Sequence, residues 1–163
     1  MSETIRETQP EAAGVAAKSY EARAYAAASV SSPLAPTTIR RRTPGPKDVQ
    51  IDVLYCGVCH SDLHQVRDEW HNSMPTTYPC VPGHEIVGTI VERGQSADRW
   101  PVGTRVGVPW LAGVCGHCSF CRNGQENLCE QARYTGYDID GGYADLVLAD
   151  LTLAELRANP VVP

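Results

Sequence analysis

Alternation of apolar and polar residues along the chain predicts an antiparallel β protein. In 48–55 the apolar residues occupy every second position: Val49, Ile51, Val53 and Tyr55. A two-residue period is typical of a strand with one buried face. Shorter apolar runs predict further strands at 84–91, 105–108 and 143–148, and a strand or hairpin within 19–39. Because turns rich in glycine and proline separate these segments, the pattern favours an all-β, barrel-like unit.

Other segments lack the two-residue period. Residues 1–19 are polar and alanine-rich, which predicts a flexible tail. After the strand at 48–55, Ser61 or Asp62 is placed to cap a short helix that runs toward Val66. Residues 68–80 predict a loop that carries Trp70. Residues 150–163 change in character, and 152–155 has the Ser/Thr-x-x-Glu form of a helix capping box.

Length and charge limit the classes of function. The 163 residues suit one domain, and the formal net charge of −5 argues against a nucleic-acid-binding surface. The only basic run, Arg40-Arg41-Arg42, is expected to be a solvated edge or turn rather than a phosphate site. No apolar run approaches the ~20 residues that span a bilayer, and the first ten residues lack the apolar region of a signal peptide. We therefore expect a cytoplasmic protein that binds neither nucleic acid nor membrane.

Seven cysteines are the strongest chemical signal, because disulfides are rare in the cytoplasm. Four of them follow one another at intervals that suit a tetrahedral zinc site: Cys115, Cys118, Cys121 and Cys129. Bound metal would supply much of the folding energy of this apolar-poor segment. An iron–sulfur cluster is the main alternative, but ferredoxin-type runs end in Cys-Pro after a shorter gap, whereas Glu130 follows Cys129. Cys56 and Cys59 would suit a thioredoxin-like redox pair only in a βαβ setting, which the β pattern does not favour.

A second candidate site combines Cys59 with the pair His84-Glu85. Gly83 and Gly88 enclose the pair, which predicts a tight backbone or the close approach of another segment. The zinc-protease motif His-Glu-x-x-His is excluded, because a glycine occupies the position of its second histidine. A lone histidine is more often a hydrogen-bonded core residue than a ligand. However, Cys59 ends a separate strand, and the two segments together could form an open zinc site completed by water.

Three motifs, in this order, resemble the zinc-dependent alcohol dehydrogenases of the medium-chain dehydrogenase/reductase superfamily, and most of all their cinnamyl-alcohol-dehydrogenase-like branch. They are YCGVCHSDLH at 55–64, VPGHEIVG at 81–88 and the four-cysteine segment. The resemblance covers about residues 20–149. It implies a GroES-like β-barrel catalytic domain with short helices, a catalytic zinc, and a structural zinc on a cysteine-rich lobe at 113–130.

The resemblance also implies roles for individual residues. Cys59 and His84 match ligands of the catalytic zinc, and Glu85 matches a neighbouring carboxylate that can approach the metal. Ser61 matches the hydroxyl that hydrogen-bonds the substrate, and His64 matches the outer end of a proton relay. The remaining matches are Asp62 (an acid that orients the zinc ligands), Trp70 (a wall of the substrate pocket), His60 (a residue near the cofactor pyrophosphate), and Cys115, Cys118, Cys121 and Cys129 (the structural-zinc ligands).

The reaction implied by this resemblance is the reversible NAD- or NADP-dependent oxidation of an alcohol to an aldehyde or ketone through a zinc-bound alkoxide. Two parts of the family pattern are missing. No cysteine follows Cys129 to supply a third catalytic ligand, and no G-x-G-x-x-G motif is present, while 150–163 is shorter than one βαβ unit of ~30 residues. We therefore expect a truncated enzyme that is inactive alone and that self-associates or needs a cofactor-binding half. The alternative is a non-catalytic zinc-binding module.

Overall fold

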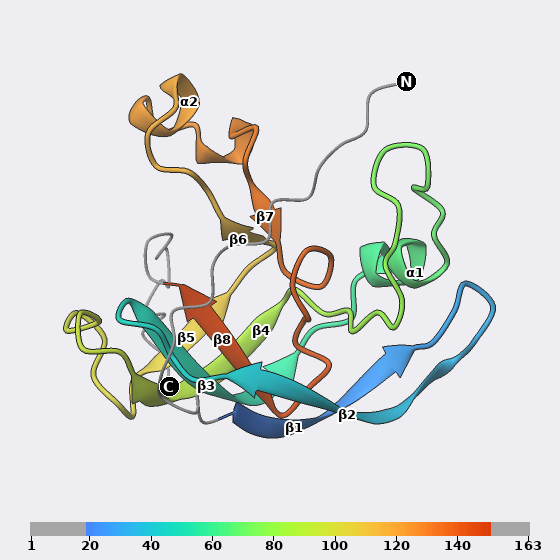
Figure 1. Cartoon of the computed structure of the whole chain (residues 1–163), viewed down its shortest axis with the longest axis horizontal. Helices are drawn as coiled ribbons and strands as arrows, with labels where there is room; N and C mark the ends of the chain where they lie inside the picture. The colour runs from blue at the N-terminus through green and yellow to red at the C-terminus, as the bar shows by residue number, and fades with distance from the viewer. Residues whose placement is uncertain (1–18, 151–163) are drawn as a thin grey trace, which may run out of the picture.

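The computed structural model describes residues 19–150, and antiparallel β-sheets form most of this part of the chain (Figure 1). The predicted tail up to residue 18 and the predicted capping box at 152–155 lie outside the described residues. The elements are β1 (Ser19–Ala27), β2 (Leu34–Arg42), β3 (Asp48–Cys56), α1 (His60–Val66), β4 (Ile86–Arg93), β5 (Arg105–Val108), β6 (Leu111–Gly113), α2 (Ser119–Arg122), the 3-10 helix η1 (Glu126–Leu128), β7 (Arg133–Tyr134) and β8 (Leu146–Asp150). Among the described residues, no helix has the length and apolar character needed to cross a bilayer.

The central sheet has four antiparallel strands in the order β5-β4-β3-β8. Ile51 of β3 pairs with Ile90 of β4 and with Val147 of β8, and all three side chains are buried. Burial of such aliphatic side chains is the main favourable contribution to folding. The core on this sheet comprises Val49, Ile51, Ile86, Ile90, Ala97, Trp100, Val106, Val108 and Val147.

The hairpin β1-β2 runs along one side of the central sheet, at the bottom of the view in Figure 1. The buried side chains of β1 are all small, and they are those of Ala22, Ala24, Ala26 and Ala27. Small residues allow the backbones to approach, and β-bridges join Ala24 to Ala144 and Ala27 to Cys80. The hairpin thus fixes the two loops that lead into β4 and β8.

A small lobe projects away from the central sheet, at the upper left of Figure 1. The two-stranded sheet β6-β7 forms its base, and α2 and η1 lie beyond it. Between Cys115 and Cys129, the regular secondary structure consists of α2 and η1. The prediction of a mainly β, barrel-like unit with short helices and a cysteine-rich lobe is confirmed.

The strand boundaries differ in part from those predicted. The predictions at 48–55 and 105–108 are confirmed, but β4 begins at Ile86 rather than at residue 84, and β8 begins at Leu146 rather than at residue 143. The predicted burial of Tyr55 is wrong, since its side chain is 75% exposed. A register shift between Val53 and Tyr55 interrupts the ladder, and such a bulge changes the face that the following side chains occupy. Gln50, predicted on the polar face, is buried.

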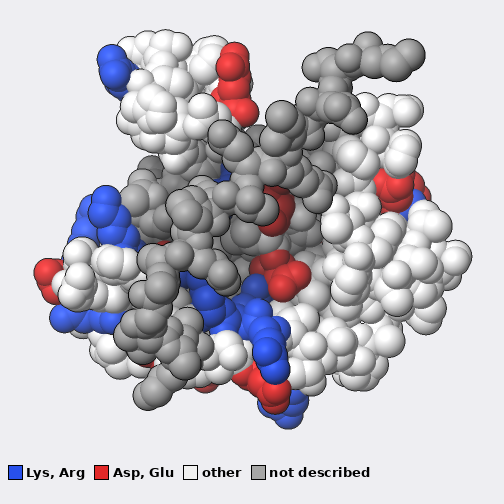
Figure 2. Space-filling view, viewed as in Figure 1, with Lys and Arg blue, Asp and Glu red and all other residues white. Residues whose placement is uncertain are grey.

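The basic run at 40–42 has a structural role. Arg41 was expected at a solvated edge but is buried, and its guanidinium donates hydrogen bonds to the carbonyls of Leu146, Asp140 and Gly141. Burial lowers the pKa of Arg41, and the charge of Asp140 partly compensates. Figure 2 shows that Lys and Arg side chains gather at the left and lower centre of this face, next to a few Asp and Glu side chains, while most of the right-hand part is uncharged. Arg41 therefore ties β2 to the segment that leads into β8.

Candidate functional site

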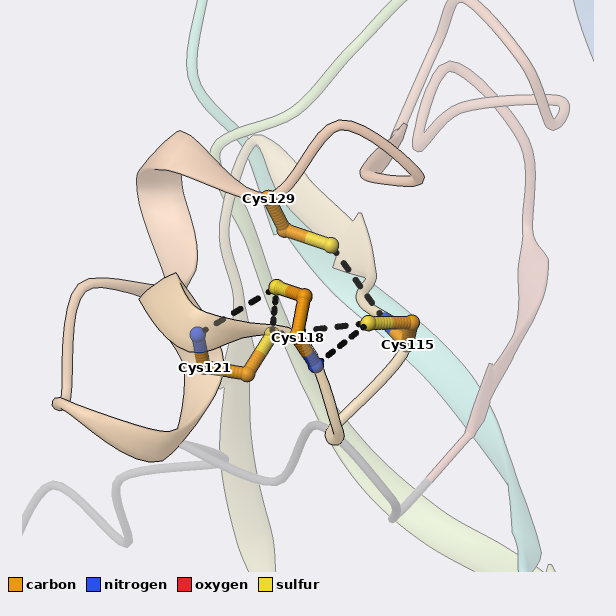
Figure 3. Close-up of side chains that lie close together, drawn as sticks. All are labelled: Cys115, Cys118, Cys121 and Cys129. Atoms are coloured by element: carbon orange, nitrogen blue, oxygen red, sulfur yellow. Dashed lines mark hydrogen bonds between the residues drawn. The ribbon is translucent and has the colours of Figure 1, made fainter.

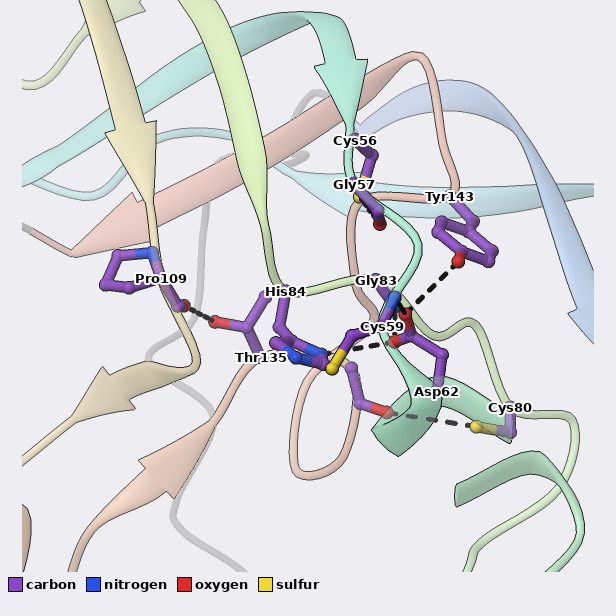
Figure 4. Close-up of polar contacts among 11 residues, drawn as sticks. Cys56, Gly57, Cys59, Asp62, Cys80, Gly83, His84, Pro109, Thr135 and Tyr143 are labelled. Atoms are coloured by element: carbon purple, nitrogen blue, oxygen red, sulfur yellow. Dashed lines mark hydrogen bonds and ion pairs between the residues drawn. The ribbon is translucent and has the colours of Figure 1, made fainter. Parts of the chain in front are cut away.

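Strand pairing brings Cys59 and the pair His84-Glu85 to the same end of the central sheet. β3 ends at Cys56, which pairs with Ile86 at the start of β4, so the residues after β3 and those before β4 are neighbours. The sulfur of Cys59, a ring nitrogen of His84 and a carboxylate oxygen of Glu85 lie within 4.8 Å of one another. Figure 4 shows Cys59 and His84 directed toward each other from these two segments. The predicted convergence of these segments is confirmed.

The glycines that enclose His84-Glu85 allow close backbone approach, as predicted. Gly83 has a φ of +103°, and a Cβ there would lie 2.8 Å from the backbone nitrogen of Tyr143. Gly88 faces the backbone of β3, and a Cβ there would lie 2.4 Å from the carbonyl oxygen of Asp52. Contacts this short exclude any side chain without movement of the backbone. Both glycines are therefore required by packing around the site.

Asp62 connects the two segments through its buried carboxylate. It lies in the first turn of α1 and is 6% exposed. Its Oδ1 accepts a hydrogen bond from the Gly83 amide at 2.9 Å and lies 3.1 Å from His84 Nδ1. Its Oδ2 accepts from the Cys59 amide at 3.0 Å and from the Tyr143 hydroxyl at 3.1 Å (Figure 4). Since Nδ1 of His84 faces this carboxylate, Nε2 is the nitrogen left for a metal.

The helix cap at α1 differs from the prediction. Cys59, rather than Ser61 or Asp62, is the N-cap residue, and its extended φ/ψ angles are those expected at this position. Asp62 occupies the third helical position, from which its carboxylate reaches back to the Cys59 amide. This reciprocal arrangement is a capping box in which cysteine replaces the usual serine or threonine. The cap therefore fixes the backbone of a candidate metal ligand.

The chemistry of the group Cys59, His84 and Glu85 suits a divalent metal. Thiolate, imidazole and carboxylate are the three ligand types that zinc accepts, and three protein ligands leave a fourth position open. Glu85 is exposed and its side chain lies over Gly57, where a Cβ would meet Glu85 Oε2 at 2.1 Å. Ligand atoms around one zinc lie about 3.5 Å apart. The bound of 4.8 Å on the separations in this group is compatible with that spacing.

The four lobe cysteines form the second group of candidate metal ligands (Figure 3). The sulfurs of Cys118 and Cys121 are 3.4 Å apart, and those of Cys115 and Cys121 are 3.9 Å apart. Zn–S bonds of ~2.3 Å place the sulfurs of a tetrahedral site about 3.8 Å apart, so these separations fit a single ion. An iron–sulfur cluster would need a wider arrangement of the sulfurs.

Backbone amides of the lobe are directed at the cysteine sulfurs. The Cys118 amide donates to Cys115 Sγ at 3.3 Å, the Cys121 amide to Cys118 Sγ at 3.4 Å, and the Cys115 amide to Cys129 Sγ at 3.4 Å. Amide donors from His117 and Cys118 lower the pKa of Cys115 to about 6, because they stabilise its thiolate. Burial raises the pKa of Cys121 to about 12. A bound cation would stabilise the thiolate form of all four cysteines.

The other predicted site residues lie on or just after α1. His64 contacts three neighbours: its Nδ1 pairs with the Glu69 carboxylate, and its ring lies 4.4 Å from the His60 ring and 5.2 Å from the Trp70 ring. Ser61 is half-buried on the same helix. Among the described residues no hydrogen bond joins Ser61 to the His84 group. The roles of these residues in substrate and cofactor binding remain predictions.

Two residues near the site were not identified from the sequence. Trp110 lies edge-on to His84, with ring centroids 5.1 Å apart, and stacks on Tyr134 at 4.9 Å. Trp110 could have been identified from the sequence, because it is a large aromatic residue between the predicted strand at 105–108 and the cysteine-rich lobe. Tyr143 donates to Asp62 from the loop before β8, and nothing in its apolar run indicates this bond.

All seven cysteines are free in the structure, which agrees with ligand or thiol chemistry rather than disulfide formation. Cys80 is buried, and burial raises the pKa of its thiol to about 11. Burial likewise raises the pKa of Cys56. These two thiols are thus held neutral, and they lie outside both candidate ligand groups.

Comparisons with known proteins agree with this geometry. Residues 45–156 match the model of the alcohol dehydrogenase GroES-like domain. An aldehyde reductase of Escherichia coli (strain K12) is 52% identical over 108 residues, which are 66% of this chain and 30% of that protein. A cinnamyl alcohol dehydrogenase structure from Sorghum bicolor has a TM-score of 0.74 at 35% identity, over 80% of this chain and 39% of that chain. The structure of a Helicobacter pylori relative complexed with NADP(H) has a TM-score of 0.76 at 32% identity, over 82% and 40%.

The match concerns one part of these relatives. The chain spans about 30–40% of the length of the relatives and structures that it matches. Within that part, the agreement covers the central sheet, the His84-Glu85 segment and the cysteine lobe, since the domain match runs from 45 to 156. The chain therefore belongs to the zinc-dependent alcohol dehydrogenase family of the medium-chain dehydrogenase/reductase superfamily and carries its GroES-like domain.

Proposed function

We propose that this chain is the alcohol-binding, zinc-carrying part of a zinc-dependent alcohol dehydrogenase. The observation that carries the proposal is the convergence of Cys59, His84 and Glu85 from two segments within 4.8 Å, beside a buried carboxylate that orients His84. Cys115, Cys118, Cys121 and Cys129 hold the structural zinc in the lobe. Zinc at the first group would supply Lewis-acid polarisation of an alcohol or aldehyde oxygen.

The residues on α1 provide the proton path in this proposal. Ser61 hydrogen-bonds the substrate oxygen, and His64 transfers the proton to solvent. Contact with the Glu69 carboxylate favours the proton on His64 Nδ1 and leaves Nε2 as the acceptor. Trp70, whose ring lies beside His64, and Trp110, edge-on to His84, would line the substrate side. His60, exposed on α1, is the residue that we assign to the cofactor pyrophosphate.

Hydride transfer requires a nicotinamide cofactor, NAD or NADP, which family members bind in a separate Rossmann domain. The described elements of this chain belong to the β unit and the lobe. The partner surface proposed for a cofactor-binding portion, or for a second copy, is the apolar patch of Tyr55, Val58 and Val87. Tyr55 of β3 pairs with Val87 of β4, and Val58 directly precedes Cys59. Tyr55 is 75% exposed, Val58 is 85% exposed and Val87 is 39% exposed. Exposed apolar patches mark interaction sites.

The test uses the full chain with zinc in the lobe and cobalt(II) at the weaker site, followed by visible absorption. A short primary alcohol or its aldehyde should shift the cobalt bands, and a His84→Ala variant should show neither the bands nor the shift. Without a cofactor-binding partner, the chain should reduce no aldehyde with NADH or NADPH above a zinc-only control. Turnover by the chain alone, or cobalt bands insensitive to alcohol, would contradict the proposal.

A non-catalytic zinc-binding module is the second candidate. The observation in its favour is that the group has three candidate ligands where the lobe has four, and that one of the three, Glu85, is exposed. Under this alternative the lobe takes up zinc and folds, while the cobalt spectrum at the weaker site does not respond to alcohol. The same titration therefore separates the two functions. We also propose a cytoplasmic location, where a reducing environment would keep these cysteines available as ligands.

A further inference from the structure

The buried carboxylate of Asp62 is surrounded by hydrogen-bond donors from three separate segments of the chain. The Cys59 amide comes from the start of α1, and Gly83 and His84 come from the segment before β4. The Tyr143 hydroxyl comes from the loop that leads into β8. A buried carboxylate is stable only when such donors satisfy it. Tyr143 is the donor farthest from Asp62 in sequence, and it belongs to neither candidate ligand group.

Tyr143 is held in place by its own backbone. Its amide donates to the Pro82 carbonyl at 3.0 Å, and its carbonyl accepts from the Tyr25 amide of β1 at 2.8 Å. The preceding residue, Gly142, donates to the Gly83 carbonyl at 2.8 Å. The loop before β8 therefore pairs with the segment 82–83 directly ahead of His84. A rigid backbone on both sides leaves the tyrosine ring little freedom to move away from Asp62.

The hydroxyl of Tyr143 acts as a donor. Burial raises the pKa of Tyr143 well above its ordinary value, and the negative charge of Asp62 raises it further. The phenol therefore keeps its proton throughout the working pH range. The Tyr143 hydroxyl bonds Asp62 Oδ2, whereas His84 faces Asp62 Oδ1. The bond from Tyr143 therefore fixes the rotation of the carboxylate, and this rotation sets the position of the oxygen that His84 contacts.

We propose that Tyr143 is a positioning residue for the catalytic metal, acting through Asp62. Its hydroxyl holds the Asp62 carboxylate so that Oδ1 stays directed at His84 Nδ1, which fixes the imidazole with Nε2 toward the metal. Outer partners of metal ligands commonly change metal affinity in this way. This inference rests on the proposed function of the Cys59–His84–Glu85 group and adds a third segment of the chain to its support.

The test compares zinc affinity at the two sites of the full chain, by competition with a chromophoric chelator. Tyr143→Phe removes one hydroxyl and preserves the ring. It should weaken the Cys59–His84–Glu85 site about tenfold and leave the lobe site unchanged. Tyr25→Phe is the matched control, because Tyr25 is 54% exposed and lies beside the Tyr143 backbone, and it should change neither affinity. Hydrogen exchange of the Cys59 and Gly83 amides, with zinc in the lobe only, should accelerate in Tyr143→Phe and remain unchanged in the core of β3.

A double-mutant cycle distinguishes positioning from a general packing effect. If Tyr143 acts through Asp62, Tyr143→Phe combined with Asp62→Asn should weaken the site no more than Asp62→Asn alone. Additive losses, equal losses at both metal sites, or unchanged zinc affinity and amide exchange in Tyr143→Phe would overturn the proposal. If the wild-type site binds zinc and responds to alcohol, and Tyr143→Phe behaves in the same way, this inference is refuted and the proposed function stands. Absence of zinc at the wild-type site would refute both.

Discussion

Asp62 Oδ1 lies 3.1 Å from His84 Nδ1, and this contact joins α1 to the segment before β4. Both side chains are shielded from solvent, with 7% of Asp62 and 11% of His84 side-chain surface exposed. The contact fixes the plane of the imidazole, and the same carboxylate fixes the Cys59 amide. One acidic residue thus contacts both candidate metal ligands, which come from different segments.

Asp62→Asn should weaken metal binding at the Cys59–His84–Glu85 group about 10–100-fold. The asparagine lacks the negative charge, and its NH₂ group can accept nothing from the Cys59 amide or the Tyr143 hydroxyl. Zinc affinity from chelator competition measures this change. Asp98→Asn is a suitable control, because the Asp98 side chain is 79% exposed and far from the site in the fold. Equal affinities in the two variants would refute the role given to Asp62.

Gly83→Ala should destabilise the chain by roughly 2–5 kcal/mol, from left-handed backbone strain together with the contact between the new Cβ and Tyr143. Gly103 provides a matched control. It also has a positive φ of +90°, but no described atom lies within 4 Å of a Cβ built there. Gly103→Ala should therefore cost only about 1–2 kcal/mol. Denaturant unfolding measures both, and equal losses would show that packing at Gly83 is unimportant.

Removal of zinc with a strong chelator should unfold the lobe and spare the central sheet. The lobe has short helices and few buried apolar side chains, whereas β3 and β4 carry the main core. Amide hydrogen exchange should rise across 115–129 and stay slow for β3. Cys121→Ser should give the same local pattern without chelator. Loss of protection in β3 at the same chelator concentration would contradict a separate structural role for the lobe metal.

Stability should decrease between about pH 9 and pH 11 because of Cys80. Burial raises its pKa from 9.0 to about 11, so in this interval the folded chain keeps the thiol proton and the unfolded chain releases it. The stabilisation is therefore complete below pH 9 and is lost as the pH rises through 11. Urea unfolding of wild type and Cys80→Ala across this range measures it. A wild-type slope no steeper than that of the variant would show that Cys80 ionises normally.

The sequence allowed the site to be predicted more fully than the strand boundaries. Cys59, His84 and the four lobe cysteines could be selected as candidate ligands because metal ligands are restricted to a few residue types, and the structure brings them together in two groups. The exposure of Tyr55 could not, since it depends on a bulge in the pairing of β3 with β4. The capping role of Cys59 was missed because serine or threonine is the usual residue at that position.

Long-range polar contacts were also beyond prediction from the sequence. Tyr143 reaches Asp62 across 81 residues, and Arg41 reaches the Leu146 carbonyl across 105. Such bonds depend on how the hairpin β1-β2 and the loop before β8 pack together, and no local pattern encodes that packing. Arg41 illustrates the consequence, because a run of three arginines suggested a solvated edge and one of them is buried.

Zinc content of the purified full chain tests the central claim most directly. The measurement is elemental analysis after equilibration with excess zinc, and again after dialysis against a chelator of moderate strength. The two ligand groups predict two zinc ions per chain before dialysis and one after it, with the retained ion in the lobe. His84→Ala should hold one ion under both conditions. Two equally resistant ions in the wild type, or the same zinc content in wild type and His84→Ala, would contradict the account.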